Sequence, residues 1–150
     1  MAELSAPDDR GVRRLTFRRL DEVPAVLKQL TALAEAVGYG SRAVFGLRLS
    51  LEEVLTNAVR HGNKGDADKV VRVEANVNGA EASYAIEDEG AGFVPADLPD
   101  PTDPEYLLRP CGRGVMLMHA YMTEVRYNDR GNRVTLVKRK DCPRPVLDEE

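Results

Sequence analysis

The sequence predicts an α/β two-layer sandwich, in which helices cover one face of a mixed, mainly antiparallel sheet. Two observations lead to this prediction. Two neighbouring segments in the first half of the chain repeat apolar residues every three or four positions, as helices do, whereas several shorter segments have the composition or the alternation of strands. The elements follow in the order strand, two helices, two strands, long loop, helix and two strands.

The first three elements are a strand and two helices. Residues 13–19 combine β-formers with charge and predict a short edge strand. Apolar residues at helical spacing predict a helix over 21–37, which two glycines end. Ser41 is the expected N-cap of a second helix that runs to about His61.

The remaining strands form two hairpins. Residues 70–77 alternate apolar and polar side chains, Asn78-Gly79 is a strong hairpin turn signal, and 80–88 returns as the partner strand. The second hairpin pairs 123–128 with 133–138 around a short polar turn. Together the two hairpins supply most of the predicted sheet.

A long segment separates the two hairpins. Residues 89–112 hold five prolines and three glycines, and they predict a mobile loop with one helical turn near 105–108. A loop of this length in a compact domain is usually functional. Residues 115–122 follow it as a short apolar helix.

Composition limits the class of protein. A chain of 150 residues fits one domain, which we expect at 13–139, between a flexible N-terminus at 1–12 and a flexible tail at 140–150. The formal net charge of -4 disfavours a nucleic-acid binder, and no segment reaches transmembrane length. The two cysteines fit no metal-ligand spacing. These features favour a protein of the reduced cytoplasm, with no membrane and no direct nucleic-acid partner.

The first candidate site residues lie on the second predicted helix. Glu53 and Asn57 are four residues apart and share one face of it, and His61 extends the row by a turn. An amide oxygen can ligate Mg²⁺, and a carboxylate can deprotonate an attacking hydroxyl. The alternative is a solvated polar face in which Glu53 pairs with a neighbouring base.

The second candidate lies where the strand 80–88 ends. Asp88 could accept a hydrogen bond from the amino group of adenine and would repel the carbonyl group that guanine has at that position. Gly90 and Gly92 would let the backbone turn sharply and approach the base. The alternative is an ordinary acidic turn with glycines at positive φ.

The third candidate is a glycine-rich entry into the predicted helix 115–122. Gly112 and Gly114 would free backbone N–H groups to face a phosphate, and the helix dipole would add to the attraction. Arg109 or Arg113 could bring a cation to the terminal phosphates. The alternative is a glycine-rich helix start flanked by surface arginines.

The order of these motifs is more specific than any one of them. An E-x-x-x-N helix, a D-x-G-x-G strand end, a flexible stretch and a G-x-G before a helix follow one another in one small domain. This resembles the GHKL superfamily of gyrase B, histidine kinases and mismatch-repair ATPases, over roughly residues 13–139. More closely, residues 51–63 look like the E-x-x-T-N-A-x-x-H-G stretch of the anti-sigma-factor serine/threonine kinases.

The resemblance implies the Bergerat fold, with ATP and Mg²⁺ held between the helix layer and a mobile lid over 94–111. It assigns Glu53 as the catalytic base, Asn57 as the magnesium ligand and Asp88 as the adenine anchor. Its other assignments are the adenine-side glycines, Gly90 and Gly92, and the phosphate-side glycines, Gly112 and Gly114.

The same resemblance implies an ATP-dependent serine/threonine kinase that binds a sigma factor and phosphorylates a small antagonist of the anti-sigma factor. The alternative is a nucleotide-gated protein-binding module with little or no kinase activity, which would not need a base such as Glu53. A histidine-kinase-like catalytic domain is a third interpretation, and the lack of an upstream acceptor helix argues against it. The sequence leaves the oligomeric state open, a homodimer included.

Overall fold

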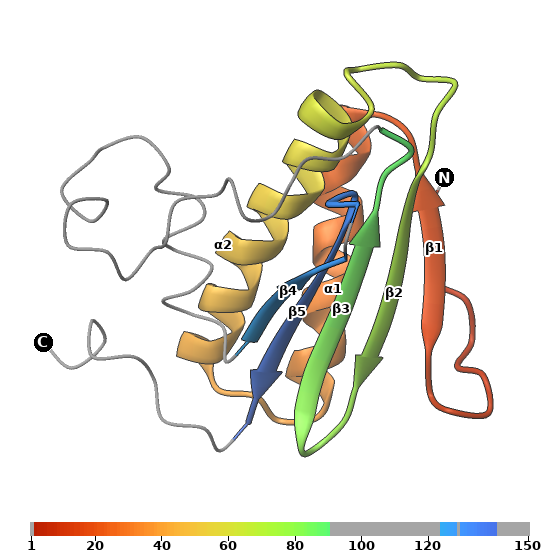
Figure 1. The fold of residues 1–150 in the computed structure, drawn as a ribbon. Helices are drawn as coiled ribbons and strands as arrows, with labels where there is room; N and C mark the ends of the chain where they lie inside the picture. The colour runs from red at the N-terminus through yellow and green to blue at the C-terminus, as the bar shows by residue number, and fades with distance from the viewer. Residues whose placement is uncertain (1, 91–123, 129, 141–150) are drawn as a thin grey trace, which may run out of the picture.

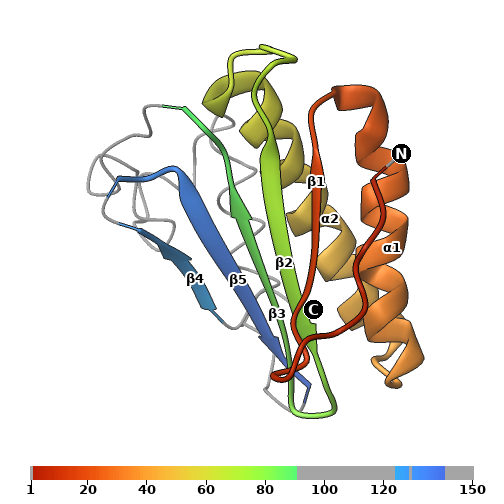
Figure 2. The ribbon, with the colours of Figure 1, turned by 90° about the vertical axis from the view of Figure 1, so that its right-hand side faces the viewer.

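The computed structural model describes residues 2–90, 124–128 and 130–140, which form the predicted two-layer sandwich (Figure 1). One layer is a five-stranded sheet with the order β1-β2-β3-β5-β4, and each pairing between these described strands is antiparallel. The other layer consists of two helices on one face of the sheet, as the side view in Figure 2 shows. The predicted loop beyond Gly90, the helix at 115–122 and the tail at 141–150 lie outside the described residues.

The helix layer follows the first strand. β1 (Arg13–Phe17) leads through a short 3-10 turn, η1 (Leu20–Glu22), into α1 (Val23–Ala36). After a short connection comes α2 (Ser41–Asn57), which continues directly into a π-helical turn, η2 (Ala58–Gly62). The two helices predicted before the first hairpin are therefore present, and the second ends in an unexpected geometry.

The start of α2 corrects one prediction. Ser41 is the first helical residue, and Gly40 occupies the N-cap position in an extended conformation without a side-chain cap. The carbonyl of Gly40 accepts the first helical hydrogen bond from the N–H of Val44, at 3.0 Å. Glycine is itself an acceptable N-cap, so the preference for serine did not fix the boundary.

The first hairpin consists of β2 (Val71–Val77) and β3 (Glu81–Glu87). Asn78 donates its backbone N–H to the Glu81 carbonyl at 3.0 Å, and its Oδ1 accepts two backbone hydrogen bonds across the turn. Gly79 has no positive φ, unlike the glycine of the Asn-Gly turn that the sequence suggests. The hairpin is confirmed, whereas its turn is held by the asparagine side chain.

The second hairpin consists of β4 (Glu124–Tyr127) and β5 (Arg133–Arg139). β5 also pairs with β3 in a register that sets Arg133 opposite Glu87. The turn before β5 therefore lies beside the point where the chain leaves β3. This adjacency brings Asn132 to Asp88.

The core lies between the sheet and the helices. Its fully buried side chains come from both layers: Val26, Leu30, Leu47, Leu51 and Leu55 from the helices, and Val71, Val73, Tyr84, Ile86 and Leu136 from the sheet. Tyr84 donates its hydroxyl to the Leu30 carbonyl at 2.9 Å, and burial raises the pKa of that hydroxyl. The one polar group that enters the core from this strand thus has a partner in α1.

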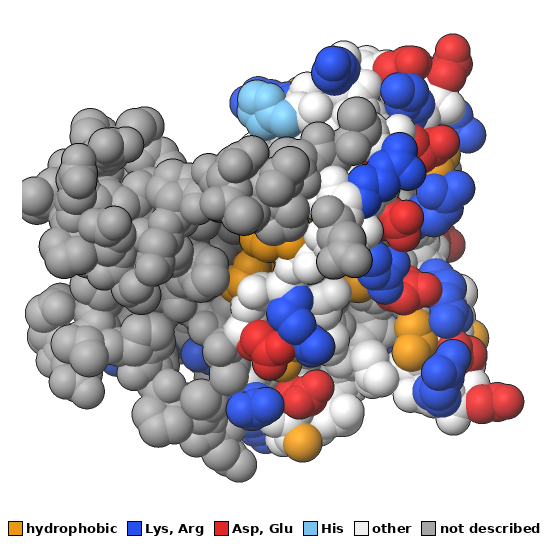
Figure 3. Space-filling view, in the orientation of Figure 1, with side chains coloured by type: hydrophobic (Ala, Val, Ile, Leu, Met, Phe, Trp, Pro, Cys, Tyr) orange, Lys and Arg blue, Asp and Glu red, His pale blue; other side chains and the backbone are white. Residues whose placement is uncertain are grey.

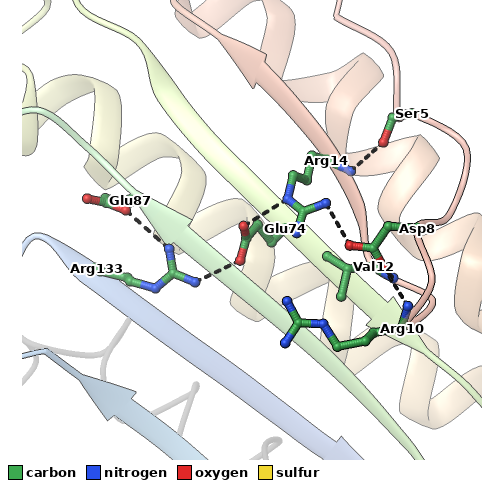
Figure 4. Close-up of polar contacts among 8 residues, drawn as sticks. All are labelled: Ser5, Asp8, Arg10, Val12, Arg14, Glu74, Glu87 and Arg133. Carbon is green, nitrogen blue, oxygen red and sulfur yellow. Dashed lines mark hydrogen bonds and ion pairs between the residues drawn. The ribbon is translucent and has the colours of Figure 1, made fainter.

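The other face of the sheet carries a row of ion pairs (Figure 4). Arg133 reaches both Glu87 at 3.1 Å and Glu74 at 2.9 Å, while Arg14 reaches both Glu74 at 3.0 Å and Asp8 at 2.9 Å. Basic and acidic side chains are interspersed over the face that Figure 3 shows. The described side chains on this face therefore form no single-sign patch of the kind that attracts a phosphate backbone.

Residues 2–12 run back along β1. Gln29 on α1 accepts a hydrogen bond from Leu4 N–H at 2.8 Å and donates Nε2 to a carbonyl near the start of the chain. Asp8 caps the following turn, and hydrogen bonds from that turn, Val12 N–H first, lower its pKa to about 2. Flexibility of this segment in solution stays a prediction. Across the described residues, no helix is both long and apolar enough to cross a membrane.

Candidate functional site

Glu53 and Asn57 lie together on α2, as their spacing predicts. Asn57 donates Nδ2 to Oε2 of Glu53 at 2.9 Å, and both side chains are half-buried. The amide nitrogen is used in this bond, and the Oδ1 of Asn57 accepts no hydrogen bond from the described residues. The two residues therefore form a coupled pair one helical turn apart.

The end of the helix departs from α geometry. The N–H of Asn63 bonds to the carbonyl of Ala58 at 2.8 Å, which closes a π turn. Lys64 and Gly65 then adopt left-handed conformations, with φ of 54° and 74°, and end the helix. π turns inside helices are often found at functional sites.

This helix end lies against the end of β3. A Cβ placed on Gly62 would lie 2.2 Å from Oδ2 of Asp88, and a Cβ on Gly90 would lie 2.0 Å from the carbonyl oxygen of Gly62. Only glycine fits at either position without displacing its neighbours. Gly90 is thus required by close approach to the helix, and it has no positive φ.

The two carboxylate oxygens of Asp88 differ. Oδ1 accepts a hydrogen bond from Gly90 N–H at 2.8 Å, whereas Oδ2, beside Gly62, makes no hydrogen bond within the described residues. Burial raises the pKa of Asp88, and the charge of Glu87 adds to the rise. Oδ2 is therefore a partly desolvated acceptor that a bound N–H group could use.

Two buried asparagines hold the backbone around Asp88. Asn63, 1% exposed, accepts the N–H of Glu89 on Oδ1 at 2.7 Å. Asn132, 7% exposed, donates Nδ2 to the Asp88 carbonyl at 3.1 Å and accepts the Asp88 N–H on its own carbonyl at 2.9 Å. Sequence reasoning missed both roles, since an asparagine after a glycine has the ordinary composition of a turn.

His61 lies on the π turn and is exposed. It makes no hydrogen bond within the described residues. Its place in the last turn of the helix keeps it near the terminal carbonyls, where a cation is favoured.

Several predicted site residues, from both the adenine side and the phosphate side, have no described position. Gly92, Gly112 and Gly114, together with Arg109 and Arg113, lie outside the described residues, as does the predicted lid. The described part of the site is the helix face with Glu53 and Asn57 and the strand end with Asp88 and Gly90. The assignments of all these residues stay predictions.

The described side chains suit Mg²⁺ and an adenine ring. Among them no three His, Cys, Asp or Glu residues gather as a metal cluster. Mg²⁺ usually keeps several waters and shares oxygen ligands with substrate phosphates, so one amide oxygen from Asn57 fits it. The free oxygen of Asp88 fits the amino group of adenine.

The chain matches a known family over most of its length. The family described as "Histidine kinase-like ATPase domain" matches residues 18–138. Among curated proteins, the chain is similar to an anti-sigma F factor of Clostridium perfringens, 29% identical over 100 residues, which is 62% of this chain and 70% of the relative. It is also similar to the serine-protein kinase RsbW of Listeria monocytogenes, 26% identical over 119 residues, which is 73% of this chain and 74% of the relative.

Proposed function

Because the chain belongs to the histidine kinase-like ATPase domain family, we propose that it binds ATP with Mg²⁺ and transfers a phosphoryl group to a protein serine or threonine. The relative named as a serine-protein kinase supports this activity, and the relative named as an anti-sigma F factor supports the further proposal that the chain binds a sigma factor. Its phosphorylation substrate would then be a small protein antagonist of that binding.

One observation supports this function above the others. The helix that bears the Glu53–Asn57 pair ends against Asp88, because Gly62 and Gly90 let the two backbones approach. The three groups that we propose act on ATP and its protein substrate are thus on elements that meet. They are a carboxylate base, an oxygen ligand for Mg²⁺ and an acceptor for the adenine amino group.

In the proposed reaction, the hydroxyl oxygen of the protein substrate forms a bond to the γ-phosphorus, and the bond from that phosphorus to the bridging oxygen of ADP breaks. Glu53 takes the hydroxyl proton. Asn57 orients Glu53 through its hydrogen bond and offers Oδ1 to the metal. Mg²⁺, when bound, neutralises charge on the phosphates. Asp88 selects the base by its free oxygen.

The first test is calorimetry of the purified chain with ATP, ADP and GTP, each with and without Mg²⁺. We expect binding of the adenine nucleotides, tighter ATP binding with Mg²⁺, and much weaker binding of GTP. Equal affinity for ATP and GTP would count against the role of Asp88. No binding of any nucleotide would reject the proposal as a whole.

The second test concerns the kinase activity. ATP labelled at the γ-phosphate is added with the protein to an extract of its native cells, and phosphorylated sites are mapped. Label on a serine or threonine of a small protein, lost with Glu53→Gln, is the expected result. Nucleotide-dependent capture of partners without any label would favour the binding module over the kinase.

A further inference from the structure

We infer that Asn63 and Asn132 are positioning residues that fix the carboxylate of Asp88 for recognition of the nucleotide base. The inference rests on the proposed nucleotide binding and adds to it the means by which the anchor is held. Neither residue is expected to touch the nucleotide. Both act through the backbone of residues 88–90.

Every backbone N–H of residues 88–90 is bound, each to a different acceptor. The N–H of Asp88 bonds to the Asn132 carbonyl at 2.9 Å, that of Glu89 to Asn63 Oδ1 at 2.7 Å, and that of Gly90 to Oδ1 of Asp88 at 2.8 Å. The chain leaves the sheet at this point, so ladder bonds no longer determine its path. The two asparagines replace the ladder where it ends.

Asn63 joins the strand end to the loop that follows the helix. Besides accepting from Glu89, it donates Nδ2 to the Val70 carbonyl at 3.1 Å. Val70 in turn donates its N–H to Oε2 of Glu89 at 2.5 Å. The three residues therefore form a closed ring of hydrogen bonds just before β2 begins.

Asn132 holds the same strand end at Asp88, one residue before the one that Asn63 holds. Its Nδ2 donates to the Asp88 carbonyl, and its Oδ1 accepts from Asn128 Nδ2 at 2.9 Å. Asn128 is itself fixed, because its Oδ1 accepts the backbone N–H of Gly131 at 2.8 Å. The position of Asp88 is thus tied to the turn between β4 and β5.

As a consequence, the two oxygens of the Asp88 carboxylate have different roles. With the backbone held on both sides, Oδ1 is used by Gly90 and Oδ2 stays beside Gly62, with no hydrogen bond from the described residues. If the hydrogen bonds from Asn63 and Asn132 are lost, residues 88–90 can rotate, and the Asp88 carboxylate can turn both oxygens to water. Discrimination between nucleotide bases then falls, even though Asp88 is present.

The test compares nucleotide affinities of Asn63→Ala, Asn132→Ala and Asp88→Asn with those of the unchanged chain. We expect ATP affinity to fall about tenfold in each asparagine variant, because the charge-assisted hydrogen bond from the adenine amino group to the Asp88 carboxylate is lost. The ratio of ATP to GTP affinity should fall with it. Asn63→Asp keeps the acceptor for the Glu89 N–H but loses the donor to the Val70 carbonyl, so it should restore that ratio only in part. Asn78→Ala, which removes an equally well bonded turn asparagine at the far end of β2, should leave the ratio unchanged.

Amide hydrogen exchange gives a second measurement that does not need every variant to fold. In the unchanged chain the N–H groups of residues 88–90 should be protected, and in Asn63→Ala that of Glu89 should lose protection while those of β3 keep theirs. Asp88→Asn losing discrimination while both asparagine variants keep it would overturn the positioning role alone. A wild-type chain that does not discriminate would reject the role of Asp88 and this inference together.

Discussion

Gly62 and Asp88 are in contact, with the α-carbon of one beside the carboxylate of the other. A Cβ on Gly62 would lie 2.2 Å from Oδ2, the oxygen that we propose meets the nucleotide. The contact joins the end of the helix layer to the end of β3. It also makes a glycine in a helical turn sensitive to replacement by alanine, which is usually the better helix former.

We therefore predict that Gly62→Ala weakens ATP binding and lowers the ratio of ATP to GTP affinity. The added methyl group displaces the Asp88 carboxylate, and such overpacking typically costs about 1–3 kcal/mol. Calorimetry and chemical denaturation measure the two effects. Gly79→Ala is the control, because a Cβ there meets nothing within 4 Å. A Gly62→Ala variant as stable as its parent, with unchanged nucleotide preference, would contradict the contact.

Glu53→Gln should abolish phosphoryl transfer and leave nucleotide affinity nearly unchanged. Glutamine can still accept the hydrogen bond from Asn57, but it cannot take a proton, so the loss appears in turnover. Transfer from labelled ATP to the bound partner is the measurement. The matched control is Glu52→Gln, an exposed neighbour on the same helix that should keep full activity. Full activity of Glu53→Gln would show that the base lies elsewhere.

Asn57→Ala should weaken nucleotide binding chiefly when Mg²⁺ is present. The variant loses the amide oxygen proposed as metal ligand and also the donor that orients Glu53. The measurement is the ratio of ATP affinity with Mg²⁺ to that without it, which should approach one. If this ratio stays at its original value, Asn57 is not a ligand of the metal.

Asp88→Asn should stabilise the nucleotide-free protein at neutral pH. Burial raises the pKa of Asp88 above its ordinary value of 3.8, so the ionised form is disfavoured in the folded state. The stability of the unchanged chain relative to the variant therefore falls as pH rises through the window between the unfolded and the folded pKa. Denaturation at pH 7.5 and below pH 4 is the measurement. An Asp88→Asn variant that is less stable than the unchanged chain at neutral pH would contradict this prediction. So would a stability difference between the two chains that grows as pH falls.

Glu74→Gln should have the opposite pH dependence and a small effect. Hydrogen bonds from Arg133 and Arg14 lower the pKa of Glu74, so its contribution is present at neutral pH and is lost as pH falls through the lowered pKa. The Glu74 side chain is 37% exposed, so solvent screens its ion pairs and we expect no more than about 1 kcal/mol. Glu81→Gln, whose partner Arg139 lies 4.0 Å away, should cost less. If both variants lose the same stability at every pH, the two arginine partners of Glu74 contribute no more than the single distant partner of Glu81.

Local sequence patterns were enough for the fold and for part of the site. Helical spacing placed both helices, and i to i+4 spacing placed Glu53 beside Asn57. The patterns failed where tertiary contacts decide. The π turn lies where the helix end meets the end of β3, and the requirement for glycine at positions 62 and 90 arises between segments far apart in the sequence.

The roles of Asn63 and Asn132 could not be predicted from local sequence patterns either. Each follows a glycine in a polar stretch, so composition assigns it to a turn, which is correct. Its burial depends on where β3 and β5 place their ends, and no local pattern contains that information. Residues whose partners are distant backbone atoms are for this reason the least predictable members of the site.

The π turn at Ala58–Gly62 has a consequence for insertions and deletions in this helix. A π turn fits one more residue than an α turn between the same two hydrogen-bonded groups, so removing a residue from it would restore α geometry and shorten the stretch that carries Gly62 against Asp88. Glu53 and Asn57 precede the turn and would keep their places. A single-residue deletion in the turn would therefore disturb the contact between Gly62 and Asp88 while leaving the Glu53–Asn57 hydrogen bond intact.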